Sequence, residues 1–319
     1  MNDLSAVFRR TGIRLFSLLG VVLIVTFVTF WMLELLPNDP CILSAGTGAT
    51  EETLAQCRLD LRLDDNLFVR YFSWLGDLVT GDLGRSYRNG IELTTSLRSA
   101  LPVTAWLLLY TVLLSLIIAI PLGIWSAYRR DTWVDRIVST GAFGLLSVPP
   151  FILGVVLALV FAVRLEWFDL AGYVSPGEGL IDHWKSLTLP TVTLAASVVP
   201  VYLRVLRTDV IETLSEDFVS VARAKGLPQW YILTRHVLRP SSFGLITVCG
   251  INAAQLLNGA VVVEVIYDLD GVGLLLLNAV FNQDISIVQT LVALIAIWFV
   301  LVNTIIDIAY PILDPRIRR

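Results

Sequence analysis

Six stretches of the chain contain no Asp, Glu, Lys or Arg and are strongly apolar. A helix needs about 20 apolar residues to cross the roughly 30 Å hydrocarbon core of a bilayer, and the stretches are 18 to 30 residues long. They are too long for barrel strands and lack the alternation of such strands. The pattern predicts an all-α integral membrane protein with six transmembrane helices, at about 15–33, 99–128, 137–163, 186–203, 240–263 and 285–306.

Composition supports the same class. Of 319 residues, 56% are hydrophobic and 16% are charged, whereas charged residues make up about 25% of soluble domains. The net charge of −4 and the three cysteines exclude a basic nucleic-acid binder and a disulfide-rich scaffold.

The distribution of positive charge predicts the orientation. Of the 23 Lys and Arg residues, 15 lie in the two terminal segments and the second and fourth connections. Since positive residues concentrate on the cytoplasmic side, both termini are expected there. The first apolar run exceeds the 7–15 residues of a signal-peptide core and no small-residue cleavage site follows it, which favours an uncleaved signal anchor.

Three regions follow from these boundaries. Residues 1–36 form an N-terminal segment with the first span, 37–98 an extracytoplasmic loop, and 99–319 a core of five spans. The loop mixes aromatic and acidic residues, which predicts a compact cap of short helices. Cys41 and Cys57 lie in it; a disulfide between them would contribute about 3 kcal/mol in the loop-entropy model, and two free thiols are the alternative.

The fourth connection, 204–239, has the pattern of two short helices. Ser215 is a candidate N-cap, and Asp217 suits the positive end of a helix. Gly226 is expected to stop this helix, and a second short helix is expected to begin near Pro228. One face of the first helix is expected to carry Phe218, Val221, Ala222 and Lys225. Such an amphipathic pair is either a cytoplasmic docking element or an interfacial helix lying on lipid.

The residues of this connection resemble the cytoplasmic coupling loop of ABC importer permeases. That family has the pattern EAA, three residues, Gly, and later I-x-L-P; here 217–240 reads DFVSVARAKGLPQWYILTRHVLRP, with Ser220, Val221 and Ala222 in place of EAA and Gly226 at the glycine. The form A-R-A-K-G-L is typical of the dipeptide/oligopeptide/nickel branch. The same branch is matched by LPNDP at 36–40, GDLGRSY at 81–87, VVVE at 261–264 and DPRIR at 314–318.

The resemblance implies a type I importer permease in a prokaryotic cytoplasmic membrane, paired with a second six-span permease as a heterodimer, the arrangement that this branch uses. Two cytoplasmic ATPases and an extracytoplasmic substrate-binding protein complete such a machine. Short peptides are the implied cargo; nickel or another chelated metal, glutathione and opine-like solutes are alternatives. The implied ATPase-coupling residues are Ser215, Asp217, Val221, Ala222, Arg223, Ala224, Lys225 and Gly226.

Energy must come from elsewhere. The only lysines, Lys185 and Lys225, do not follow glycine, so the chain lacks the Gly-Lys pair of a P-loop. ATP and Mg²⁺ are therefore expected in partner ATPases, and this chain is expected to bind no cofactor and no metal and to be a transport subunit, not an enzyme.

A few polar residues interrupt the apolar pattern near or within the spans. Asn252, Gln255 and Asn258 share one side of the fifth span, where they either line the translocation path or form interhelical hydrogen bonds. Glu264 ends this span as a gating or assembly contact or as an ordinary interfacial carboxylate. Asp307, which also matches the branch, either pairs with a cytoplasmic Arg or is solvated.

Other classes fit less well. A secondary transporter would want ionisable groups at mid-membrane and usually an inverted repeat, and neither is visible. An intramembrane hydrolase would need a histidine within a span, but His183 and His236 lie in connections. An ungated channel is the remaining alternative.

Overall fold

The computed structural model describes residues 19–35, 41–42, 50–60 and 63–313, with side chains except at 53, 57, 60, 254 and 306–313. The chain divides into two compact units: unit 1 takes 1–101 and 275–301, and unit 2 takes 102–274 and 302–319. In the described ranges the regular structure is helical, apart from one antiparallel bridge between Arg85 and Glu92. This confirms the all-α prediction for those residues.

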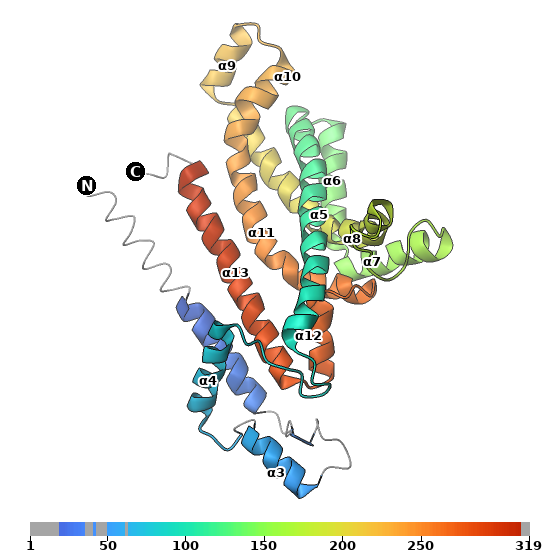
Figure 1. The fold of residues 1–319 in the computed structure, drawn as a ribbon. Helices are drawn as coiled ribbons and strands as arrows, with labels where there is room; N and C mark the ends of the chain where they lie inside the picture. Colours follow the sequence, from blue (N-terminus) through green and yellow to red (C-terminus); the bar gives the residue numbers. More distant parts are fainter. Residues whose placement is uncertain (1–18, 36–40, 43–49, 61–62, 314–319) are drawn as a thin grey trace, which may run out of the picture. The chain divides into compact units, whose positions relative to one another are not determined.

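Unit 2 is organised around one long helix, α8. It packs against α6, α7 and α11, and its central positions are mostly buried, with Tyr202 and Leu206 completely covered. Gly154 of α7 lies close to Thr193 of α8, where an added Cβ would be 3.1 Å from the Thr methyl; small residues permit such close helix packing. The helices of this unit (Figure 1) are α5 (Leu93–Tyr128, from Pro102 on), α6 (Trp133–Ser147), α7 (Pro150–Leu157), η2 (Ala158–Arg164), α8 (Leu180–Leu214), α9 (Asp217–Ala224), α10 (Gln229–Tyr231), η3 (Ile232–Val237) and α11 (Leu238–Ile266).

Unit 1 contains the first described helix, Leu19–Glu34, and the short helices that follow it. Aromatic side chains join this helix to α4: Phe27 and Phe30 both contact Tyr71, and Phe30 also lies near Trp74. The remaining helices of this unit are α3 (Glu51–Asp60), α4 (Leu67–Thr80), the first residues of α5, α12 (Val272–Phe281, from Leu275 on) and α13 (Ile285–Leu313, through Leu301). The short α3 and α4 agree with the helices expected in 37–98.

Helix lengths support several of the expected spans. Among the described residues, α5, α8 and α13 are long and apolar enough to cross a membrane, and two bent helix pairs bring the number to as many as five. The helix Leu19–Glu34 is shorter than a full span over its described part. Two helices extend beyond the expected spans: α5 begins at Leu93 and α8 covers Leu180–Leu214.

The expected span at 137–163 is not one straight helix. It is divided into α6 and the continuous pair α7–η2, which meet at 96°. Val148 and Pro149 both have extended backbones because each precedes a proline, and a residue before proline is driven out of the helical region. Pro150 then begins α7 at a position where its missing N–H costs nothing.

Candidate functional site

The expected coupling helix is α9, the eight-residue helix Asp217–Ala224 (Figure 1). It ends at Gly226, whose φ of +75° is in the left-handed region that glycine adopts without steric cost. The N–H groups of Gly226 and Leu227 donate to the carbonyls of Arg223 and Ala222, at 2.9 and 3.3 Å. The predicted stop at Gly226 is confirmed.

The predicted start of this helix was wrong. Ser215 is the C-cap residue that follows α8, and its hydroxyl donates to the Glu212 carbonyl at 2.6 Å instead of capping α9. The residue before α9 is Glu216, which has an extended backbone and makes no side-chain cap. Ser215 therefore closes α8.

The face that α9 turns toward its own chain also differs from the prediction. Val219 and Ala222 are buried, at 0% and 6% exposure, in a cluster with Ile232 and Val237 of η3. The small Ala222 thus permits close packing within this chain. The solvent-accessible positions of α9 and its end are Asp217, Phe218, Ser220, Val221, Arg223, Ala224, Lys225 and Gly226.

The expected second helix begins where predicted. Pro228 precedes α10, which continues through η3 into α11. Pro240 lies in the first turn of α11 and does not interrupt it. Trp230 of α10 is 68% exposed, so together with Phe218 and Val221 it gives this connection three exposed large apolar side chains. We call these three the apolar docking residues.

Glu264 is not an interfacial carboxylate, because its side chain is completely buried. The Thr104 hydroxyl donates to Glu264 Oε1 at 2.7 Å and the Leu274 N–H donates to Oε2 at 2.9 Å. The Gly273 N–H is a third donor, and the Val272 N–H donates to Thr104 Oγ1 at 2.9 Å. The carboxylate therefore fixes the turn between α11 and α12 against α5.

Two glycines near Glu264 in the sequence are a signal for this role. A Cβ at Gly271 would collide with the Glu264 carboxyl group, and one at Gly273 would lie 2.8 Å from it and 2.6 Å from the Val261 Cα. Two glycines spaced around a turn that follows an isolated acid indicate close approach of a backbone to a side chain. The spacing of Glu264, Gly271 and Gly273 was thus informative.

The polar residues of the fifth span lie on an open side of α11. Asn252 is half-buried, and Gln255 and Asn258 are exposed; none of the three amides has a hydrogen-bond partner among the described residues. The helix bends by 52° at this level, between Ala253 and Gln255. Among the described residues they form no interhelical hydrogen bond, and their role in a translocation path stays a prediction.

The contacts predicted for Asp307, Cys41 and Cys57 depend on side chains that the structure does not describe. The side chains of Asp307 and Cys57 lie outside the described residues, so the expected ion pair and disulfide stay predictions. Cys41 itself is completely buried.

A second polar pair in unit 2 was missed from the sequence. Asp135 is 5% exposed and accepts two hydrogen bonds from Arg207, each at 2.7 Å, together with one from Ser126 at 2.6 Å. The bidentate geometry joins the start of α6 to α8. Asp135 and Arg207 are 72 positions apart, so no local pattern could have paired them.

In unit 1, the segment matching GDLGRSY has a structural role. Asp284, 6% exposed, accepts hydrogen bonds from the Ser86 hydroxyl and, at 3.3 Å, from the Tyr87 N–H. Arg88 donates to Asn282 Oδ1 at 2.7 Å, and burial raises the pKa of the Tyr87 phenol. These bonds fasten the loop to the residues just before α13.

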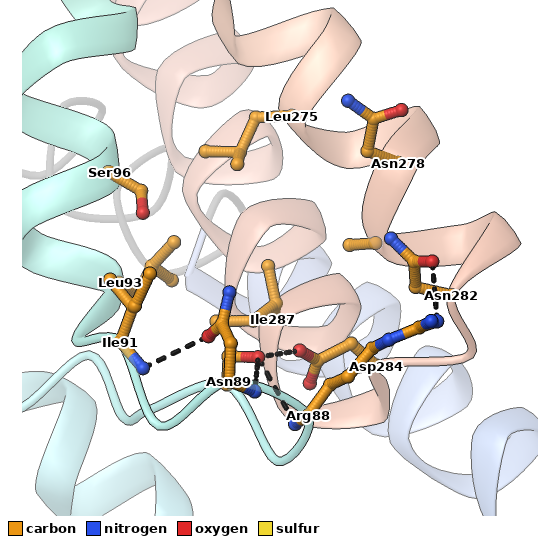
Figure 2. Close-up of a pocket in the computed structure, with 12 residues that line it drawn as sticks. Arg88, Asn89, Ile91, Leu93, Ser96, Leu275, Asn278, Asn282, Asp284 and Ile287 are labelled. Atoms are coloured by element: carbon orange, nitrogen blue, oxygen red, sulfur yellow. Dashed lines mark hydrogen bonds between the residues drawn. The ribbon is translucent and has the colours of Figure 1, made fainter. Parts of the chain in front are cut away.

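A pocket of about 160 Å³ lies beside this loop. Figure 2 shows the amides of Asn89, Asn278 and Asn282 around it, with Asp284 below. Its lining is a mixture of amides, hydroxyls and aliphatic side chains, and none of its polar groups is both buried and unpaired among the described residues. Within the part of the chain that the structure describes, no group of His, Cys, Asp and Glu side chains could hold a metal ion.

Comparison with known families and proteins covers almost the whole chain. Residues 119–319 match the family described as binding-protein-dependent transport system inner membrane component, and residues 7–108 match the N-terminal region of the same systems' membrane components. A probable peptide ABC transporter permease of Sinorhizobium fredii is 35% identical over 96% of this chain and 97% of that relative. A putative peptide transport system permease of Brucella abortus is 36% identical over the same shares.

Other similarities point the same way. The glutathione transport system permease GsiC of Salmonella typhi is 32% identical over 96% of this chain and 97% of that protein. Among solved structures, an inward-facing MetNI methionine ABC transporter matches with a TM-score of 0.58, covering 69% of this chain and 96% of that one at 17% identity, which shows a shared fold. The chain belongs to the binding-protein-dependent transport system inner membrane components: it is a multi-pass permease subunit of an ABC importer and not an enzyme.

Proposed function

We propose that this permease forms half of the translocation path of an importer for short peptides. Its partners are a second six-span permease, two cytoplasmic ATPases that hold ATP and Mg²⁺, and an extracytoplasmic substrate-binding protein. The peptide cargo is supported by relatives at 35% and 36% identity whose names specify peptides. Glutathione, which a 32% identical relative transports by name, is itself a small peptide.

The observation that carries the proposal is the arrangement of the 215–237 connection. Its inner side is anchored by Val219 and Ala222, while the apolar docking residues Phe218, Val221 and Trp230 remain exposed. An exposed apolar cluster between charged residues marks a contact surface. Arg223 and Lys225 are exposed beside it, and we assign the surface to an ATPase partner.

The same framework places the rest of the chain. We propose six spans with both termini in the cytoplasm, supported by the excess of Lys and Arg on that side, and a Cys41–Cys57 disulfide on the opposite side. The open side of α11 at Asn252, Gln255 and Asn258 faces the path. Amide side chains both donate and accept hydrogen bonds, which suits the alternating N–H and C=O groups of a peptide.

The test is affinity purification of the tagged chain from its host, comparing Phe218→Asp with a matched control, Gln229→Asp. Both positions are exposed in the same connection and both variants add one negative charge. Because changing a hot-spot residue costs about 2 kcal/mol or more, Phe218→Asp should lower the recovery of the ATPases by about tenfold or more if Phe218 is such a residue, while Gln229→Asp leaves most of it. Peptide-stimulated ATP hydrolysis should follow the same order.

Two results would contradict the proposal. If Phe218→Asp recovers as much ATPase as the wild-type chain does, α9 is not the docking site. If the wild-type chain is isolated without any ATPase and moves solute in liposomes in the absence of ATP, the proposed energy source is wrong. Uptake of dipeptides, tripeptides, glutathione and Ni²⁺ by the complete transporter identifies the cargo separately.

A further inference from the structure

Helix α4 presents three different surfaces. With about 100° per residue, Tyr71, Trp74 and Leu78 lie on one side, and Tyr71 is buried there against the helix Leu19–Glu34. Ser73, Asp77 and Thr80 form a polar side. The third side is apolar yet uncovered: Phe68, Phe72 and Val79 are 57%, 63% and 81% exposed, and Val69, which is 54% exposed, lies at its border with the polar side. We call these four the α4 stripe.

The contacts of α4 place it beside the middle of the first apolar span and not at the end of that span. The rings of Phe68 and Phe27 stack at 5.7 Å, and Phe27 precedes Glu34 by seven residues, or about 10 Å of helix. The Tyr71 hydroxyl lies 2.9 Å from Thr26 Oγ1 and 3.2 Å from the Leu23 carbonyl oxygen. These positions are in the middle of the charge-free run 15–33, so this part of α4 lies at the depth of the hydrocarbon core. Figure 1 shows α4 alongside that helix.

A second helix of unit 1 gives a consistent depth. The Trp74 Nε1–H donates to Thr290 Oγ1 at 3.4 Å. Thr290 follows the start of α13 by five residues, about 7.5 Å along its axis. Trp74 therefore contacts α13 within the length of that helix and not at its first residue.

The one charged residue in this part of α4 behaves as a buried charge at a membrane boundary does. Arg70 extends past the Phe30 ring, 5.8 Å from its centroid, and its guanidinium contacts Glu34 at 2.5 Å. Long cationic side chains near a lipid boundary reach toward the interface in this way. The positive charge of Arg70 therefore lies at Glu34, the first charged residue after the apolar run 15–33.

From this geometry we infer that α4 lies within the extracytoplasmic leaflet, and that the α4 stripe binds the acyl chains of lipids. The stripe continues the apolar surface of the neighbouring helix, where Ile24, Trp31 and Met32 are 65%, 49% and 62% exposed. An interfacial helix of this kind has its apolar side in the acyl region and its polar side toward the headgroups and water. The inference places part of the expected extracytoplasmic cap inside the membrane, and it rests on the proposed spanning role of the first helix.

The test measures which medium touches each side of α4 in the complete transporter, reconstituted in phosphatidylethanolamine–phosphatidylglycerol vesicles. A nitroxide is attached through p-acetylphenylalanine at Val69 or Phe72, so native cysteines stay intact, and at Asp77 as the control on the polar side. Collision rates with O₂, which enters lipid, and with a water-soluble nickel chelate are then compared. The ratio of O₂ to nickel collisions should be several-fold higher at Val69 and Phe72 than at Asp77.

Two outcomes would overturn the inference. Frequent nickel collisions at all three positions would place α4 in water. Protection of Val69 and Phe72 from both reagents would show that a protein, either the second permease or the binding protein, covers the stripe. A normal ATPase recovery in the same samples would show that the importer itself is intact, which separates this result from a failure of the proposed function.

Discussion

Two connections of unit 2 are held in place by opposite kinds of interaction. The 215–237 connection is anchored by apolar side chains, with Val219, Ala222, Ile232 and Val237 all buried in one cluster. The turn between α11 and α12 is anchored by the Glu264 carboxylate, which accepts hydrogen bonds from Thr104, Gly273 and Leu274. Both segments join long helices. The 215–237 connection is held by non-directional apolar contacts, whereas the turn between α11 and α12 is held by hydrogen bonds, which require a defined geometry.

The difference indicates different mechanical roles. Apolar contacts lose little when two surfaces slide, whereas a buried hydrogen bond loses most of its value once its geometry is broken. A segment that transmits movement from an ATPase can be displaced with its helix and still remain packed. A turn clamped by a buried carboxylate is a fixed point, and removing the carboxylate should be far more damaging than changing any single apolar anchor.

The largest effect is expected for Glu264→Ala. It leaves three buried donors unpaired, each costing about 1–3 kcal/mol, so the free energy of unfolding should fall by about 3 kcal/mol or more. The thermal unfolding temperature of the purified chain in mild detergent measures this. Glu212→Ala, at an exposed carboxylate of α8, is the control and should be nearly neutral. Equal stability of the two variants would show that the Glu264 carboxylate does not stabilise the turn between α11 and α12.

Gly273→Ala tests the same clamp from the backbone side. The added methyl would lie 2.6 Å from the Val261 Cα and 2.8 Å from a Glu264 oxygen, and overpacking of this kind costs about 1–3 kcal/mol. The matched control is Gly141→Ala on α6, where nothing lies within 4 Å. Since Ala is the better helix former, the control should gain up to about 1 kcal/mol, so the unfolding temperatures should move in opposite directions.

Local patterns and tertiary contacts were not equally predictable. Periodicity and turn chemistry located the short helix that ends at Gly226 and the next one after Pro228, because each depends on neighbours in the sequence. The prediction of one face with Phe218, Val221 and Ala222 was wrong for the buried side of α9. The spacing of these three residues fits a helical stripe, and only the packing of α9 against η3 selects Val219 as a buried residue. The Asp135–Arg207 and Glu264–Thr104 contacts join distant positions, so they required the fold.

Ala222→Leu tests the apolar side of the comparison. A leucine would force α9 away from Ile232 and Val237 and should cost about 1–3 kcal/mol. The control is Ala224→Leu, at an exposed position of the same helix, which should leave stability within about 0.5 kcal/mol. Peptide-stimulated ATP hydrolysis should fall with Ala222→Leu at a temperature where the chain is still folded; unchanged hydrolysis would show that the position of α9 does not matter for coupling.

The smallest effect is expected for Gly226→Ala, because it alters neither a buried contact nor a hydrogen bond. No heavy atom lies within 4 Å of the added Cβ, and the backbone φ of +75° is the sole obstacle. A left-handed conformation costs an L-residue about 1–2 kcal/mol, which should appear as a modest loss of unfolding temperature. Asn tolerates this conformation better than Ala, so Gly226→Asn should recover part of the loss. If the two variants are equally destabilised, something other than backbone strain at Gly226 determines where α9 ends.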